Sequence, residues 1–182
     1  MADFSFLDAM EDAKTLRYEE AMEAVNKGDI DKYIGNPGII NGLNMTPLIA
    51  LIEENATKEA VECLELGCNP NLPQYWIDGR KRTYPLEVAC EKGDYVIVKT
   101  LLEKGADVSL CNLNLTLWST ISWYKWEMEC RDEGKRENYL DCIKFLFDKG
   151  ANPDYSPPKC KSSIESSKNN PEIIEIFSKN SP

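Results

Sequence analysis

The feature that most constrains this chain is an internal repeat. Three segments carry nearly the same residues, in the order acidic residue, any residue, glycine, small residue and Asn or Asp. Each follows an apolar stretch with helical spacing, and a triplet related to Thr-Pro-Leu lies upstream of it. Similar residues thus recur both before and after each apolar stretch, which predicts one supersecondary unit that is repeated along the chain. The segments are Glu65–Asn71, Glu103–Ser109 and Asp148–Asp154, and the triplets are Thr46–Leu48, Tyr84–Leu86 and Thr116–Trp118.

The chemistry of these positions predicts a pair of helices in each unit. Proline in a first helical turn loses no hydrogen bond and has its φ angle already set. Glycine after a second helix permits a left-handed C-cap. Each helix pair has one apolar face that it cannot bury alone, so neighbouring pairs must stack, and the end copies should be atypical.

The most complete copy runs from Tyr84-Pro85-Leu86 through Gly93 to Gly105. It resembles the ankyrin repeat, which has a period of about 33 residues and the signature T-P-L-H-x-A. The resemblance covers residues 18–178 of the 182-residue chain and implies an all-α ankyrin-repeat solenoid in one domain. Its parts would be an acidic N-terminal helix or arm (1–17), an N-cap repeat (18–40), two repeats (41–78 and 79–112), an enlarged repeat (113–154) and a C-cap repeat (155–182).

The chain departs from the ankyrin period in two places. Pro47 and Pro85 are 38 residues apart, and the excess falls in Leu72–Arg82, where the family has its finger hairpin. Gly105 and Gly150 are 45 residues apart, and the surplus has a helix-favouring composition. We therefore expect the inner helix of this repeat to run past its neighbours and to turn near Gly134.

A third departure concerns the histidine of the T-P-L-H signature. The family uses that histidine to tie neighbouring repeats together, so the resemblance implies that this chain ties them differently. The positions hold Ile49, Glu87, Ser119 and Glu165.

Aromatic and charged side chains in the two lengthened segments are the candidate binding residues. Trp and Tyr are enriched at binding hot spots, and extra length in repeat arrays tends to fall on the binding face. Trp118 is expected in the core, whereas Trp123 and Tyr124 are expected on the concave face. Alternatively, Trp123 and Trp126 seal the inserted hairpin, and the finger is a solvated loop. The partner-binding set is Tyr75, Trp76, Arg80, Lys81, Glu87, Glu91, Trp123, Tyr124 and Trp126.

Composition argues against several classes of function. Lys and Arg number 21 against 31 Asp and Glu, a net charge of −10, which argues against nucleic-acid binding because such proteins need basic surface. Without histidine, the chain cannot build a Ser-His-Asp or Cys-His site or a histidine-ligated zinc site. We expect no catalytic residues, cofactor, metal or membrane span. The seven cysteines are odd in number, which favours free thiols and a cytoplasmic location.

The sequence therefore predicts a monomeric, non-catalytic module that binds a protein or peptide through its concave face, finger and inserted hairpin. Two alternatives remain open. One is a small acidic inhibitor that neutralises a basic enzyme, with the nine acidic residues among residues 1–31 speeding association. The other is a small-ligand protein with a pocket between the hairpin and the finger.

Overall fold

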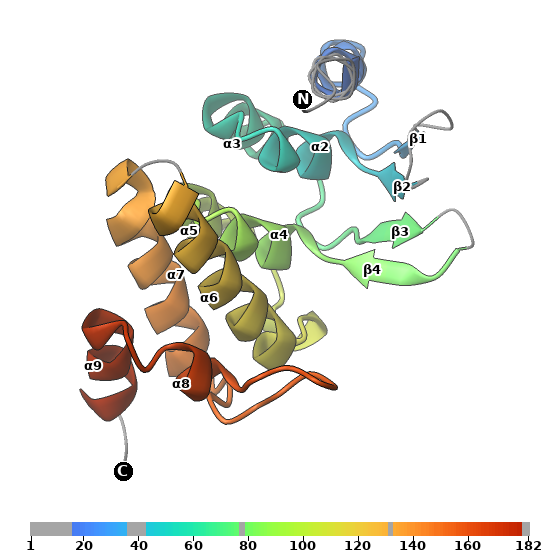
Figure 1. Ribbon diagram of the computed structural model, residues 1–182. Helices are drawn as coiled ribbons and strands as arrows, with labels where there is room; N and C mark the ends of the chain where they lie inside the picture. Colours follow the sequence, from blue (N-terminus) through green and yellow to red (C-terminus); the bar gives the residue numbers. More distant parts are fainter. Residues whose placement is uncertain (1–15, 36–42, 77–78, 131–132, 180–182) are drawn as a thin grey trace, which may run out of the picture. The chain divides into compact units, whose positions relative to one another are not determined.

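The computed structural model describes residues 16–35, 43–76, 79–130 and 133–179 (Figure 1). These residues are mostly helical, as the sequence predicts, and the strands among them are short. The helix or arm predicted over residues 1–17 lies outside the described part, except that residues 16–17 open a helical segment at 16–26. The chain divides into two compact units, Met1–Pro85 with Thr100–Ala106 and Leu86–Lys99 with Asp107–Pro182.

The first unit contains a small antiparallel sheet, in which the strands follow their order in the sequence (Figure 1). Asn44 lies opposite Tyr75 where the second strand meets the third, and Gln74 lies opposite Thr83 where the third meets the fourth. The lengthened finger segment therefore forms a hairpin from the last two strands. The strands are β1 (Ile34–Gly35), β2 (Leu43–Met45), β3 (Gln74–Trp76) and β4 (Lys81–Thr83).

Two helices complete the first unit, α2 (Pro47–Glu53) and α3 (Thr57–Glu65). The Thr46 hydroxyl accepts a hydrogen bond from the N–H of Ile49 at 3.4 Å and so caps α2, which begins at a proline as predicted. Every residue from 47 to 52 is buried. Such a helix is apolar all round because other elements cover its whole circumference.

The same backbone hydrogen bond closes the helix at each of the glycines in the three repeated segments. In each, the N–H of the residue after a glycine reaches the carbonyl five positions earlier, at 2.9 to 3.3 Å. The glycine has a positive φ, which marks the Schellman cap expected for the repeated glycines. The bonds run from Cys68 to Cys63, from Ala106 to Leu101 and from Ala151 to Leu146.

Two further helices carry residues of both units, α4 (Pro85–Glu91) and α5 (Tyr95–Glu103). Leu86, Ala89 and Leu101 are buried, as the repeat phase predicts. The apolar stretch before Gly105 predicts that Leu102 is buried together with Leu101, but the structure leaves Leu102 only half-buried. Adjacent helix positions point about 100° apart, so Leu102 lies at the edge of the face on which Leu101 is central.

The other regular elements described in the second unit are helices and 3-10 turns, and α6 is the longest of them. It has 18 residues, against 7 in α2 and 7 in α4, which agrees with the expected extension. The 3-10 turn η2 (Glu133–Lys135) contains Gly134, the predicted turn residue. Helix α7 packs beside α6 and against α9 (Figure 1). The elements are η1 (Val108–Leu110), α6 (Leu113–Cys130), α7 (Arg136–Asp148), α8 (Ser163–Ser166) and α9 (Pro171–Lys179).

Hydrogen bonds join turns that are about one period apart in sequence. The N–H of Asn69 donates to Asp31 at 2.7 Å in the first unit, and the N–H of Asn152 donates to Asn114 at 2.7 Å in the second. Both pairs are 38 residues apart. Turns from consecutive segments therefore lie side by side within each unit.

Candidate binding surface

The base of the β3–β4 hairpin is held by a tyrosine pair. The Tyr33 hydroxyl donates a hydrogen bond to the carbonyl of Pro73 at 2.8 Å. Its ring lies 5.6 Å from the ring of Tyr75, tilted by 54°. Burial, and then the neighbouring Tyr75, raises the pKa of Tyr33 to about 12. Tyr75, predicted to contact a partner, is half-buried by this pairing.

Trp76 and Arg82 form a second pair on the same hairpin. The guanidinium carbon of Arg82 lies 5.4 Å from the centre of the Trp76 ring, which is within the range of a cation–π contact. Arg82 also donates to Gln74 and lies 3.4 Å from a Glu53 carboxylate oxygen. These contacts hold Trp76 in a half-buried position on the finger, with part of its surface accessible.

The remaining basic side chains of the finger are exposed. Arg80 and Lys81 both lie on the outer part of the hairpin. The Lys81 ammonium lies 4.5 Å from the centre of the Tyr84 ring and 3.2 Å from its hydroxyl. The β3–β4 hairpin thus carries half-buried Tyr75 and Trp76 and three exposed basic residues, Arg80, Lys81 and Arg82.

Glu87 does not line an open surface as predicted, because it is 8% exposed. Its carboxylate accepts hydrogen bonds from the N–H of Asn112 at 2.8 Å and from the hydroxyl of Thr116 at 3.2 Å. The glutamate at the T-P-L-H position therefore ties α4 to the start of α6, the role that the family gives to histidine. Glu91 is half-buried, and its carbonyl accepts from the Tyr139 hydroxyl at 3.2 Å.

Helix α6 exposes two tryptophans. Trp123 is 47% exposed and Trp126 is 41% exposed. Their ring centres are 5.7 Å apart and the rings are perpendicular, an edge-to-face geometry that stabilises an aromatic pair. The pair holds the two indoles in a defined arrangement on the helix surface.

Tyr124 contradicts the expected exposure, because only 2% of it is accessible. Its ring meets the Tyr139 ring edge to face at 6.1 Å, and its hydroxyl donates to Glu172 at 3.3 Å. Burial, and then Glu172, raises the pKa of Tyr124. The side chain belongs to the core that α6 shares with α7 and α9, so it is removed from the candidate surface.

Trp118 differs from its prediction in the opposite sense. It was expected in the core, but it is half-buried and its indole N–H donates to the carbonyl of Lys161 at 3.0 Å. The preceding Leu117 is fully buried instead. Leu117 and Ile121 are buried like Pro85 and Ala89 at the same positions of the repeat, so the apolar phase is kept and Trp118 lies at its edge.

Sequence reasoning missed two features of the second unit. Leu115 is exposed and shares a stripe with Ser119, Ser122 and Trp126, a spacing of four, three and four that marks one helix face. The other feature is an ion pair in which Arg136 donates to both carboxylate oxygens of Glu172, at 3.1 and 2.6 Å. The stripe could have been found from its spacing. The ion pair could not, because its members are 36 residues apart.

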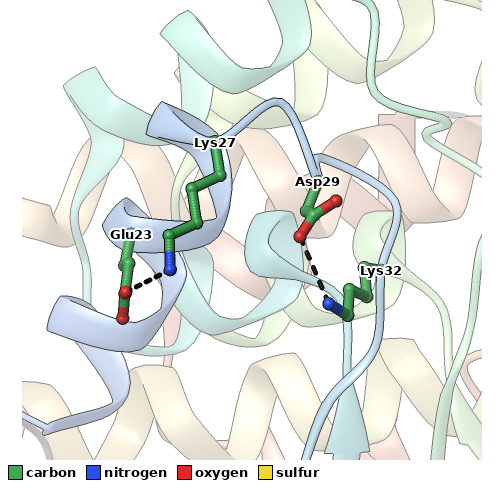
Figure 2. Close-up of polar contacts among 4 residues, drawn as sticks. All are labelled: Glu23, Lys27, Asp29 and Lys32. Carbon is green, nitrogen blue, oxygen red and sulfur yellow. Dashed lines mark hydrogen bonds and ion pairs between the residues drawn. The ribbon is translucent and has the colours of Figure 1, made fainter.

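The acidic N-terminal region forms local ion pairs where it is described. Figure 2 shows Lys27 beside Glu23 and, across the turn, Lys32 with its ammonium 3.2 Å from Asp29. Both pairs join exposed side chains three or four residues apart. Water and salt screen exposed pairs of this kind, so they add little to stability. They make this region a solvated, partly neutralised surface with a shallow hollow of about 220 Å³.

Other kinds of site have little to build on in the described ranges. No three His, Cys, Asp or Glu side chains there are grouped so as to hold a metal ion. A hollow of about 320 Å³ lies between α7 and α9, with lysines and carboxylates of both helices around it. Within the same part of the chain, every helix is too short or too polar to cross a bilayer.

Comparison with known proteins agrees with the geometry of the best-formed copy. Residues 83–113 match the family model described as an ankyrin repeat. This segment contains α4, α5 and η1. No curated protein matches the chain. The match therefore supports an ankyrin-repeat protein and identifies residues 83–113 as similar to one such repeat.

Proposed function

We propose that this chain is a protein-binding module that binds a protein or peptide partner. Ankyrin repeats generally mediate protein–protein interactions and are typically not enzymes. The observation that carries the proposal is the pair Trp123 and Trp126, two large indoles left exposed on α6 and fixed against each other. Exposed Trp is the residue type most often found at the centre of protein interfaces.

The edge-to-face contact strengthens the argument for binding. Ordering a free side chain at an interface costs about 0.5–1.5 kcal/mol. Two rings already packed against each other have lost part of that freedom before a partner arrives. A pair that only sealed the fold would be covered by other elements, whereas these rings are 47% and 41% exposed.

The finger hairpin of the first unit is a second, separate candidate surface. Trp76 stacks on Arg82, and Arg80 and Lys81 are exposed beside it. Arginine donates two parallel hydrogen bonds to a carboxylate or phosphate. The finger is therefore suited to an acidic segment of a partner, although the whole chain has a net charge of −10.

The wider architecture proposed is a solenoid of three internal repeats between two caps, the third internal repeat being enlarged by α6 and α7. The three matching helix caps and the hydrogen bonds between turns 38 residues apart support it. An array of this kind needs no catalytic group, since its binding surface is built by side chains of successive copies.

Site-specific photo-crosslinking in the native lysate would identify the partner. A benzophenone amino acid replaces Trp126 in one variant and exposed Leu66 in a second, which serves as the control. We expect one protein to crosslink at position 126 and not at position 66. The affinity of that protein is then measured for Trp123→Ala, Trp76→Ala and Leu66→Ala.

Each tryptophan variant should weaken binding by at least about 2 kcal/mol, the usual hot-spot threshold, which is a roughly 30-fold higher Kd. Leu66→Ala should leave the Kd unchanged. Melting temperatures are measured on the same variants. An unchanged Kd together with a collapsed melting temperature for Trp123→Ala would overturn the proposal, because the indoles would then be stabilising the fold alone.

A further inference from the structure

Two buried thiols meet where helix α3 ends. Cys63 is 0% exposed and Cys68 is 3% exposed, and both are free. The N–H of Cys68 donates to the carbonyl of Cys63 at 3.3 Å, and the neighbouring Cys68 thiol lowers the pKa of Cys63. Gly67, with φ of +92°, makes the left-handed turn that brings the chain back.

The matching helix ends show that this cap does not need sulfur. The same backbone bond joins Ala106 to Leu101 and Ala151 to Leu146. In both of these Schellman caps, the two places are held by an alanine and a leucine. At α3 both places are taken by cysteine. Helix capping therefore accounts for the backbone turn at the end of α3, and it requires a thiol at neither place.

We propose that Cys63 and Cys68 form an oxidation site, in which a peroxide converts the two thiols into a disulfide that closes the end of α3. The proposal is independent of the binding function. A disulfide forms without backbone movement when the Cα atoms lie about 4.4–6.8 Å apart. The backbone hydrogen bond from Cys68 to Cys63 at 3.3 Å brings the two residues together at this turn.

The two sulfurs differ in a way that assigns the order of reaction. The hydrogen bond from Cys68 lowers the pKa of Cys63, because it stabilises the thiolate. The same hydrogen bond, followed by burial, raises the pKa of Cys68. The thiolate is the nucleophile in thiol chemistry, so Cys63 is the residue that attacks the peroxide and Cys68 is the resolving residue.

The reaction has two balanced steps. The Cys63 thiolate attacks one oxygen of hydrogen peroxide, an S–O bond forms, the O–O bond breaks and hydroxide leaves. The Cys68 sulfur then attacks the sulfenic sulfur, the S–S bond forms, and hydroxide leaves with the thiol protons as water. Two thiols are oxidised to one disulfide, and one peroxide is reduced to two molecules of water.

The two cysteines flank an exposed turn. Leu66 and Gly67, the residues between them in the turn, are exposed. Helix ends open locally more readily than core segments. Hydrogen peroxide is close to water in size, so it needs only a small opening of this turn.

Peptide mapping of the full chain tests the site directly. The reduced protein is treated with hydrogen peroxide, alkylated and digested with trypsin, which releases residues 59–80 as a peptide that carries both cysteines and no others. We expect this peptide to become lighter by two hydrogens and to escape alkylation. Cys90 and Cys142, a buried pair that also shares a thiol hydrogen bond, serves as the internal control.

The control pair should react more slowly, since the contact with Cys142 and then burial raise the pKa of Cys90 and the thiolate is the reacting form. In Cys68→Ser, which keeps a hydroxyl donor beside Cys63, the peptide should gain oxygen instead of losing hydrogen. Cys68→Ala, which copies the alanine of the other two caps, checks that the fold survives. A peptide 59–80 that stays fully alkylated, or a disulfide between two chains, would overturn the proposal.

Discussion

Gly93 lies where the chain turns between α4 and α5, directly under an aromatic ring. Its φ is +62°, and a Cβ atom at this position would lie 2.5 Å from the nearest ring carbon of Tyr139. That ring cannot move away easily. It is buried, its hydroxyl donates to the carbonyl of Glu91 and its edge meets Tyr124. Glycine is therefore required here both by the backbone angle and by the close approach.

Substituting Gly93→Ala should lower the free energy of unfolding by about 2–4 kcal/mol, from the left-handed backbone and the steric overlap together. Gly105→Ala is the matched control, since its φ is +90° and nothing lies within 4 Å of its Cβ position. It should cost only the backbone part, about 1–2 kcal/mol. Urea denaturation measures both. Equal losses in the two variants would show that the Tyr139 ring yields to the methyl group.

Tyr33 makes the stability of the first unit fall as the pH rises in the alkaline range. Its pKa is about 12 in the folded chain against an ordinary 10.0, so the folded state holds the proton more tightly than the unfolded state does. The contribution is complete below pH 10 and is lost as the pH rises from about 10 to about 12. The free energy of unfolding should therefore fall over this window, and less steeply in Tyr33→Phe. Denaturation at a series of pH values tests this, and identical slopes would contradict it.

At the scale of elements, first-turn prolines and glycine caps set where several helices begin or end. Packing against other elements then decides which face of a helix is buried. Helix α5 illustrates this with two adjacent leucines. Leu101 is fully buried and also supplies the carbonyl that Ala106 binds, whereas Leu102 is half-buried. Two neighbouring residues of the same type thus occupy the centre and the edge of one apolar face.

Truncating these two leucines to alanine should lower the free energy of unfolding by different amounts. Leu101→Ala should lower the free energy of unfolding by about 2–5 kcal/mol, from lost transfer free energy and the cavity left behind. Leu102→Ala should cost clearly less, about 1 kcal/mol, because water and side chains can fill the space at the edge. Chemical denaturation of the two variants provides the comparison. A larger loss of unfolding free energy at position 102 would mean that Leu102, and not Leu101, lies at the centre of the buried face of α5.

At the scale of the whole molecule, the cysteines are spread through both units. Cys63, Cys68, Cys90 and Cys142 are free and buried, and Cys111 and Cys160 are free and more accessible. Buried cysteine acts as a small apolar residue. The stability of the resting protein is therefore expected to come from packing and hydrogen bonds rather than from covalent crosslinks.

The melting temperature should consequently be the same with and without reductant when the protein has not met an oxidant. Differential scanning calorimetry of freshly prepared protein, with and without dithiothreitol, tests this expectation. A native disulfide would instead contribute about 2–4 kcal/mol, and reductant would then lower the melting temperature by several degrees. That result would also count against the cytoplasmic location that the sequence predicts.

The sequence by itself determined the starts of α2 and α4 and the ends of α3, α5 and α7. Those limits depend on short-range chemistry, such as Pro47 in a first turn, Thr46 as its cap and Gly67 in a left-handed C-cap. The long α6 was predictable for the same reason, because its composition favours helix over many consecutive residues. The location of the turn at Gly134 followed from the break in that composition.

Only the tertiary structure decided which side chains of those helices remain exposed. Trp123 and Tyr124 are neighbours of similar character, yet one is 47% exposed and the other 2%. Their difference comes from Tyr139 and Glu172, which lie far along the chain and cover one side of α6 only. Glu87 was likewise buried by Asn112 and Thr116. A helical pattern shows that residues share a face, but the burial of that face depends on which distant elements pack against it.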